Sequence, residues 1–508
     1  MIDYLKRLLH TGSAYTVSSV LAKLFAVFTL PLYTKYLTPV ELGQAEILAI
    51  SVVVASIILR GGMIEALLRF HHRYPERQKE VARTAFWSIL VGVTLGAALF
   101  LALVPQLSQL LLQSNTNSAE SLVRIAILGL WLFTFYELLL AFFRIEEHAR
   151  GYATATIINV LITIPLTIWL VVIRKQGASG YLLGNYIGTG IIVVALLYVQ
   201  RNVIGRPGVP MLREMAAFGR PTVPAEVSLY ALNFADRLML AYIPSSRLTG
   251  YAYAGLYSVA AKLAQGVTVF VRAFQLAWPP LAYSIKSDQE ASKVYGRVLT
   301  YYLLVMSAPL AFLALNSRML ADFLVAPKFF QSYQAIPLLA TGVALYGAYL
   351  VLVTAVARTG KTRAMFPIAL TGLAVNIALC WILIPSLNIR GAGLSLIGAY
   401  LVILSLMYLR ARRAIGLDLE WQRLIHIVLA AGAVILSGSL LLPTEAGGWY
   451  LARVAWLGLY PLLLLVTGFF SKAELQQLRT ARQLLKRSSD AEALPDGPAL
   501  VEQMHDGE

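Results

Sequence analysis

Long apolar runs recur along nearly the whole chain and constrain its fold more than any other feature. Runs of 18 or more mostly apolar residues are long enough to cross a bilayer as helices. Of the 508 residues, 58% are hydrophobic and only 13% are charged, and the mean hydropathy is +0.69. A soluble domain cannot bury so large an apolar fraction. The sequence therefore predicts an all-α, polytopic membrane protein.

The apolar runs predict about fourteen transmembrane helices. The predicted spans are 12–37, 42–60, 82–104, 122–143, 151–173, 181–200, 216–243, 251–275, 297–316, 333–357, 364–385, 391–409, 424–442 and 451–470. The first run follows two cations, as a signal peptide does, but it is longer and lacks a small-residue cleavage site, so we interpret it as a retained span. Cys380 is the single cysteine, which excludes an intrachain disulfide and a cysteine-cluster metal site.

The connections between these spans alternate in charge. If the N-terminus is cytoplasmic, even-numbered connections such as "RFHHRYPERQKEVAR" and "RARRAIGLDLEWQR" are basic, whereas the third, "PQLSQLLLQSNTNSAES", has no cation; "RKQGAS" is a mild exception. Short basic loops stay on the cytoplasmic side of a membrane. Both termini are therefore predicted to be cytoplasmic. The net charge of +16 follows from this distribution and does not indicate nucleic-acid binding.

The sequence also contains an internal repeat. "GASGYLLGNYIG" from residue 177 and "GAGLSLIGAYLV" from residue 391 share two glycines, an alanine and a tyrosine at one constant offset. A weaker similarity relates "YTKYLTPVELGQAEI" to "LAYIPSSRLTGYAYAGLYS". We expect two six-helix lobes with two additional helices. The predicted division is a first lobe at 1–204, a linker at 205–215, a second lobe at 216–415, two added helices at 416–471 and a cytoplasmic tail at 472–508.

Several segments resemble one family of membrane transporters. "PLYTKYLTPVELGQAEI", "GGMIEALLRF" and above all "FGRPTVPAEVSLYALNFADRLMLAYI" followed by "GLYSVAAKLAQGVTVFVRAFQLAWPPLA" are similar to the Wzx-type flippases. These belong to the multidrug/oligosaccharidyl-lipid/polysaccharide exporter superfamily. The resemblance implies a V-shaped pair of lobes in the bacterial inner membrane. It also implies transport of a polyprenyl-diphosphate-linked oligosaccharide to the outer leaflet, with the bilayer and a polymerase of the polysaccharide pathway as further partners.

Charged residues inside the spans are the candidates for the transport site, because a charge at the bilayer centre usually faces a cavity or a partner. Lys23 lies too deep in the first span to reach water comfortably. In the seventh span, four polar residues at spacings of four, three and four share one helix face. The predicted substrate-binding residues are Lys23, Glu226, Tyr230, Asn233, Arg237 and Lys262. Cations in this set suit a diphosphate, and the hydroxyl, amide and aromatic groups suit sugars.

Asp236 is the candidate for ion coupling. Neighbours on a helix point about 100° apart, so Asp236 must turn away from the Arg237 face and toward another helix. The lipid II flippases are similar in using an acid in span seven with an asparagine in span eleven for sodium, and Asn376 is the matching residue here. Cys380 replaces a further expected acid, so sodium and a proton both remain candidates. Pairing with a cation such as Lys262, or simple anchoring at the membrane interface, are the alternatives.

No motif indicates an ATPase, a resident cofactor, a metal site or a hydrolase. Two other functions fit a polytopic chain of this kind. A multidrug/cation antiporter of the same superfamily usually has twelve spans and acidic cavity residues without matching cations, unlike the predicted set. A membrane-embedded polysaccharide polymerase or ligase has a large outward loop, whereas the longest predicted outward connection has about seventeen residues. We therefore predict a transporter and not an enzyme.

Overall fold

The computed structural model describes residue 25 and residues 27–470, with gaps at 245, 286, 359–364 and 444–448. The described residues form helices and no strands. A first bundle comprises α3 (Pro39–Arg60), α4 (Met63–Arg73), α5 (Gln78–Ala102), α6 (Val104–Leu112), α7 (Asn117–Ile145), α8 (Ala149–Ile168), α9 (Gly177–Val199) and α10 (Val209–Gly219). A second comprises α11 (Val223–Tyr242), α12 (Arg247–Ala264), α13 (Gly266–Ser284), α14 (Asp288–Leu324), α15 (Ile336–Arg358), α16 (Met365–Ile415), α17 (Trp421–Leu441), α18 (Trp449–Trp456) and α19 (Leu459–Val466).

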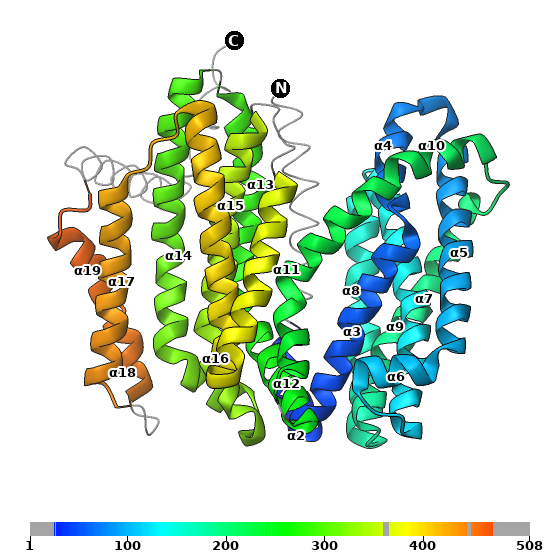
Figure 1. Ribbon diagram of the computed structural model, residues 1–508, viewed down its shortest axis with the longest axis horizontal. Coiled ribbons are helices and arrows are strands. Elements are labelled where there is room, and N and C mark those ends of the chain that lie inside the picture. Colours follow the sequence, from blue (N-terminus) through cyan, green and yellow to red (C-terminus); the bar gives the residue numbers. More distant parts are fainter. Residues whose placement is uncertain are drawn as a thin grey trace, which may run out of the picture.

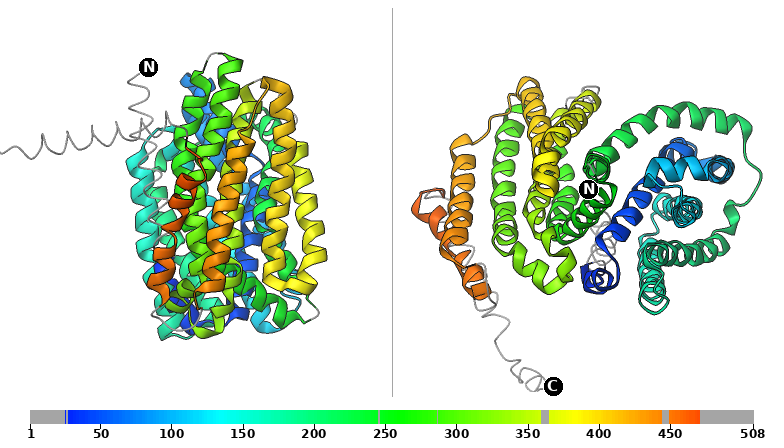
Figure 2. Two further views of the ribbon diagram at one scale, coloured as in Figure 1. Left: turned by 90° about the vertical axis from the view of Figure 1, so that its left-hand side faces the viewer. Right: turned by 60° about the horizontal axis from the view of Figure 1, so that its bottom comes forward.

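The two bundles converge at one end and diverge toward the other (Figure 1). The short helix α2 (Leu30–Tyr36), α6 and α12 lie at the convergent end, and α4 and α10 lie at the divergent end. The chain crosses between bundles where the 3-10 turn Arg220–Thr222 joins α10 to α11. Helices α17 to α19 stand at the outer edge of the second bundle, beside α14 (Figure 2).

Helix α3 is the element of the first bundle that packs most extensively on the second. It begins with a capping box, in which Thr38 and Glu41 satisfy each other's backbone N–H groups, and Pro39 stands at its first position. It ends at Gly61 and Gly62, which both adopt left-handed conformations. These signals place one straight helix along the boundary between the bundles.

The crossing of α3 and α12 closes the convergent end. A Cβ atom on Gly43 would lie 1.9 Å from the carbonyl oxygen of Tyr251, and one on Gly255 would lie 2.1 Å from that of Pro39. No other residue than glycine allows two helices to approach so closely. The tyrosines Tyr242 and Tyr251 also donate hydrogen bonds to the carbonyl oxygen of Leu111, both at 3.1 Å.

Ten helices of the described chain are long and apolar enough to cross a membrane, or eleven if the bent α12–α13 pair counts as one span. A multi-pass membrane protein is thereby confirmed, whereas the number fourteen stays a prediction. Most of the predicted span 12–37 lies outside the described residues. The spans 364–385 and 391–409 join in α16, whose backbone leaves helical geometry at Asn388. The predicted division into lobes and linker also stays a prediction, and its tail at 472–508 lies outside the described residues.

Three predicted spans are wrong as single helices, and one of them is 251–275, which covers most of α12 and the first part of α13. Residues 216–243 are divided by the 3-10 turn at Arg220–Thr222, because Pro221 and Pro224 remove two backbone donors there. The apolar C-terminal run is also divided, into α18 and α19. Short helices at the bundle ends, α4, α6 and α10, were not expected, since a hydropathy window detects only long apolar segments.

Candidate substrate site between the bundles

Two ion pairs join α3 to the second bundle. Near the convergent end, the Lys262 ammonium of α12 donates to Glu46 Oε1 at 2.7 Å and to the Tyr181 hydroxyl of α9 at 3.0 Å. Only 18% of the Lys262 side chain and 14% of the Glu46 side chain are exposed. Charges this poorly solvated persist only when they are paired and hydrogen-bonded. Lys262, predicted to bind substrate, is therefore neutralised by a residue that the sequence did not single out.

The second ion pair lies about 21 Å further along α3, at 1.5 Å per residue. There the Arg60 guanidinium, 8% exposed, binds Glu226 of α11 and lies 3.8 Å from Glu65 of α4. Glu226 Oε2 is buried without a hydrogen bond among the described residues. Glu226, the first residue of the predicted polar face on α11, thus contacts the other bundle directly. Arg60 is shared between one acid of its own bundle and one of the opposite bundle.

Arg237 is the cation of α11, and no acid of the described chain forms an ion pair with it. Its guanidinium carbon lies 4.8 Å from the centre of the Phe234 ring, and Phe234 stacks on Tyr230 at 4.3 Å between ring centres. Its Nε atom is buried without a hydrogen bond. The charge of Arg237 also acts on Glu46 across the bundle boundary. Tyr230 and Arg237 therefore form one half-buried group, joined by Phe234.

Asp236 turns away from this group, as expected for the next position of a helix. It is 1% exposed and accepts hydrogen bonds from the Tyr257 hydroxyl of α12 and, at 2.9 Å, from the Arg237 backbone N–H. The alternative pairing of Asp236 with Lys262 is wrong, because Lys262 binds Glu46. Asp236 is buried among helices, and the alternative of anchoring at a membrane interface stays a prediction.

Three predicted residues remain, and the structure describes the side chain of one of them, Asn376. Asn376 of α16 is fully buried, and neither polar atom of its amide makes a hydrogen bond in the described part of the chain. Lys23 and the side chain of Asn233 lie outside the described residues. Among the residues that are described, no cluster of three or more His, Cys, Asp or Glu side chains is arranged to hold a metal ion.

A polar pocket of about 230 Å³ lies in the first bundle beside Lys262. Its polar lining residues are Thr29, Tyr33, Asn159, Thr163, Tyr181, Asn185, Thr189 and Lys262. The side chains of α8 and α9 in this set recur every four residues, so each helix presents one polar face. Sequence reasoning concentrated on charge and missed these neutral residues, although the spacing was visible in both spans.

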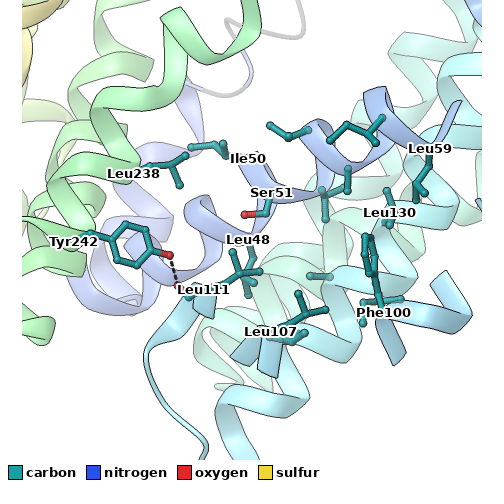
Figure 3. Close-up of a pocket in the computed structure, with 17 residues that line it drawn as sticks. Leu48, Ile50, Ser51, Leu59, Phe100, Leu107, Leu111, Leu130, Leu238 and Tyr242 are labelled. Carbon is teal, nitrogen blue, oxygen red and sulfur yellow. Dashed lines mark hydrogen bonds between the residues drawn. The ribbon is translucent and has the colours of Figure 1, made fainter. Parts of the chain in front are cut away.

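An apolar cavity of about 380 Å³ lies between α3, α6, α7 and α11 (Figure 3). Leu48 and Leu59 of α3 lie near its two ends, and Leu238 and Tyr242 of α11 form the side that faces the second bundle. Its lining is almost entirely hydrocarbon, with Ser51 and the Tyr242 hydroxyl as the polar groups in it. Charged, neutral polar and apolar surfaces therefore all meet around α3.

Similarity to known proteins agrees with this architecture. Residues 33–332, more than half of the chain, match the family described as polysaccharide biosynthesis protein. The chain belongs to this family. No curated protein is significantly similar to it in sequence. The resemblance predicted from the sequence is thereby confirmed at the level of the family.

The fold is shared with solved transporters. The lipid II flippase MurJ in an inward closed conformation aligns with a TM-score of 0.70 at 14% identity, over 89% of this chain and 98% of that chain. A multidrug resistance MATE family transporter of the MOP superfamily aligns with a TM-score of 0.63 in its inward-facing form, at 14% identity over 78% and 94% of the two chains. An outward-facing MATE family transporter of the MOP superfamily aligns with a TM-score of 0.55 at 13% identity, over 81% of this chain and 96% of that chain.

Proposed function

We propose that the chain is a flippase that moves a polyprenyl-diphosphate-linked oligosaccharide from the inner to the outer leaflet by alternating access. The observation that carries this proposal is that one helix, α11, bears both the Arg237 cation and part of the wall of the apolar cavity, which Leu238 and Tyr242 line. An amphiphile with an anionic head and a hydrocarbon tail requires both surfaces. Membership of the polysaccharide biosynthesis family supports the lipid-linked sugar as the amphiphile.

A transport assay tests this function. Purified protein is reconstituted into liposomes that carry a fluorescent polyprenyl-diphosphate oligosaccharide, and accessibility of the sugar to an external lectin is followed with time. Arg237→Gln should lower the initial rate about tenfold, because a charge-assisted contact to the diphosphate contributes about 1.5 to 3 kcal/mol. Arg124→Gln is the matched control, since Arg124 is 55% exposed and pairs with Glu120 on the surface of α7.

The competing functions give different results in the same vesicles. Equal rates for wild type and Arg237→Gln would contradict the assigned role of the guanidinium. Accumulation of a cationic dye in response to a sodium or proton gradient, without movement of the lipid-linked sugar, would establish the multidrug antiporter instead. Chain elongation of the oligosaccharide would establish the polymerase or ligase.

Asp236 is proposed as the residue that couples transport to an ion gradient, with Asn376 as its partner on α16. Two observations support this role: both side chains are buried, and the Asn376 amide is unpaired in the described chain. Sodium and a proton are both compatible with a carboxylate held by Tyr257. Asp236→Asn should abolish the response of the transport rate to the coupling gradient. A variant that keeps its full response would show that Asp236 is structural.

The proposed orientation places the divergent end of the bundles at the cytoplasm of a bacterial inner membrane, with both termini on that side. The basic connection around Gln78 supports it, together with the cation-free connection around Asn115. Reporter fusions at Gln78 should read as cytoplasmic and those at Asn115 as external. A reversed result at Gln78 would overturn the orientation.

A further inference from the structure

We propose that the polar pocket between α8 and α9 binds hydroxyl groups of the sugar that the lipid carries. This inference rests on the proposed flippase function and adds a second subsite to it, separate from the cation that meets the diphosphate. The pocket is defined by neutral side chains from two adjacent helices of the first bundle, with Asn159 and Thr163 on α8 and Asn185 and Thr189 on α9.

These four side chains leave both donors and acceptors for a ligand. Asn159 Oδ1 is buried without a partner among the described residues. One N–H of the Asn185 amide donates to the Tyr181 carbonyl oxygen at 2.9 Å, which leaves its second N–H to donate and its Oδ1 to accept. The hydroxyl groups of Thr163 and Thr189 donate to the carbonyl oxygens of Val160 and Asn185, at 3.4 and 2.8 Å. Each threonine oxygen therefore offers only lone pairs to the pocket.

A neutral surface with both donors and acceptors suits a ligand that also brings both. A sugar hydroxyl donates and accepts, whereas the oxygens of a diphosphate only accept and leave the lone pairs of the asparagine and threonine oxygens unpaired. Lys262 does not change this preference, because Glu46 already neutralises its charge. The Tyr181 hydroxyl is also occupied, since it accepts from Lys262 and donates to Glu46. The diphosphate is thereby left to Arg237, and the sugar to the pocket.

The size of the pocket fits one sugar ring and not a bare ion. Its volume of about 230 Å³ equals about eight water molecules at about 30 Å³ each. Hard cations in proteins are usually held by carboxylates together with neutral oxygens, and the residues that line this pocket include no carboxylate. We therefore favour a sugar over sodium as the occupant.

Binding measurements on the full-length protein in lipid nanodiscs test the subsite. The two probes are a polyprenyl diphosphate that carries one N-acetylglucosamine and the same lipid without sugar. Asn159→Leu and Asn185→Leu keep the branched shape of the side chain and remove its hydrogen-bonding amide. Each should weaken binding of the glycosylated lipid about three- to tenfold, the effect of one lost hydrogen bond, and leave the sugar-free lipid unchanged. Arg237→Gln should weaken both lipids equally.

Thr156→Val is the matched control for the two asparagine variants. Thr156 lies one turn before Asn159 on α8, donates to the Tyr152 carbonyl oxygen at 2.9 Å and does not line the pocket, so it should bind both lipids as wild type does. If wild type binds both probes but the asparagine variants do not discriminate between them, the subsite is refuted while the flippase stands. If wild type binds neither probe, both proposals fall. Loss of sodium binding in the variants, with both lipids unaffected, would identify a cation site and overturn the sugar subsite.

Discussion

The helix pair α8–α9 and the two arms of α16 occupy repeated positions in the sequence, but their surroundings differ. Gly184 and Tyr186 of α9 recur 214 residues later as Gly398 and Tyr400. At the same offset, the pocket residues Tyr181, Asn185 and Thr189 correspond to Ser395, Ala399 and Ile403. The three counterparts in α16 are fully or almost fully buried. The positions that pack helices are thus retained in both halves, whereas of the three pocket positions on α9 only that of Tyr181 has a polar counterpart, Ser395.

This difference shows how a duplicated scaffold acquires a site. Small residues let two helices approach each other, and glycine stands at the same register in both copies. A pocket requires only that side chains on one face become polar, and this can happen in one copy without disturbing the other. The two halves can therefore share a fold while only the first carries a surface suited to sugar hydroxyls.

The largest loss of stability is expected when a pocket residue of the first half is introduced at the matching position of the second half. Ala399→Asn places the amide of Asn185 at a fully buried position of α16. The larger side chain overpacks the core and its amide loses water without a prepared partner, so we expect a loss of about 3 kcal/mol of unfolding free energy. Chemical denaturation in detergent, followed by tryptophan fluorescence, measures the change. A loss no greater than that of Asn185→Ala would contradict the distinction between the halves.

Replacing the shared glycines by alanine should have an intermediate effect on stability, and the effect should differ between the two halves. A Cβ on Gly184 would lie 2.4 Å from the backbone Cα of Thr167, whereas one on Gly398 would meet only a terminal methyl of Leu379, at 2.5 Å. Gly184→Ala must push α8 and α9 apart, at about 1 to 3 kcal/mol. Gly398→Ala should be nearly neutral, because Leu379 can rotate and alanine favours the helix. Melting temperatures of the two variants in one detergent provide the comparison, and equal values would refute it.

The smallest effect on stability is expected for Asn185→Ala, which introduces in the first half the alanine that the second half has at the matching position, Ala399. Asn185 faces the pocket and donates only to a carbonyl of its own helix, so the variant should lose less than about 1 kcal/mol. Its binding of the glycosylated lipid should nevertheless weaken, as for Asn185→Leu. A large loss of stability would mean that the amide supports the fold and not a ligand.

Hydropathy and loop charge predicted much of this fold. The long apolar helices α3, α5, α7, α8 and α9 lie within a few residues of their predicted spans, because each buries backbone hydrogen bonds in an apolar segment of sufficient length. The break at Arg220–Thr222 was missed, since the charged and apolar residues on either side continue the same periodicity. Only Pro221 and Pro224 indicated this break in the sequence.

The candidate site was predicted less completely than the fold. Lys262 was recognised as an intramembrane cation, but its partner Glu46 lies 216 residues earlier in the chain, and a single sequence does not contain pairings between distant helices. Asn159 and Asn185 were passed over because single asparagines in a span usually serve helix packing. Their repetition with threonine at spacings of four was the available signal, and it distinguishes a polar face from an isolated polar residue.

The crossing of α3 and α12 has a further consequence. Gly255 follows Gly43 by 212 residues, and Tyr251 follows Pro39 by the same number, so each helix presents its glycine to the other's matching carbonyl group. A contact in which residue i meets j and j meets i is isologous, the geometry that two identical subunits adopt around a two-fold axis. The closed end of this single chain therefore has the form of a homodimer interface.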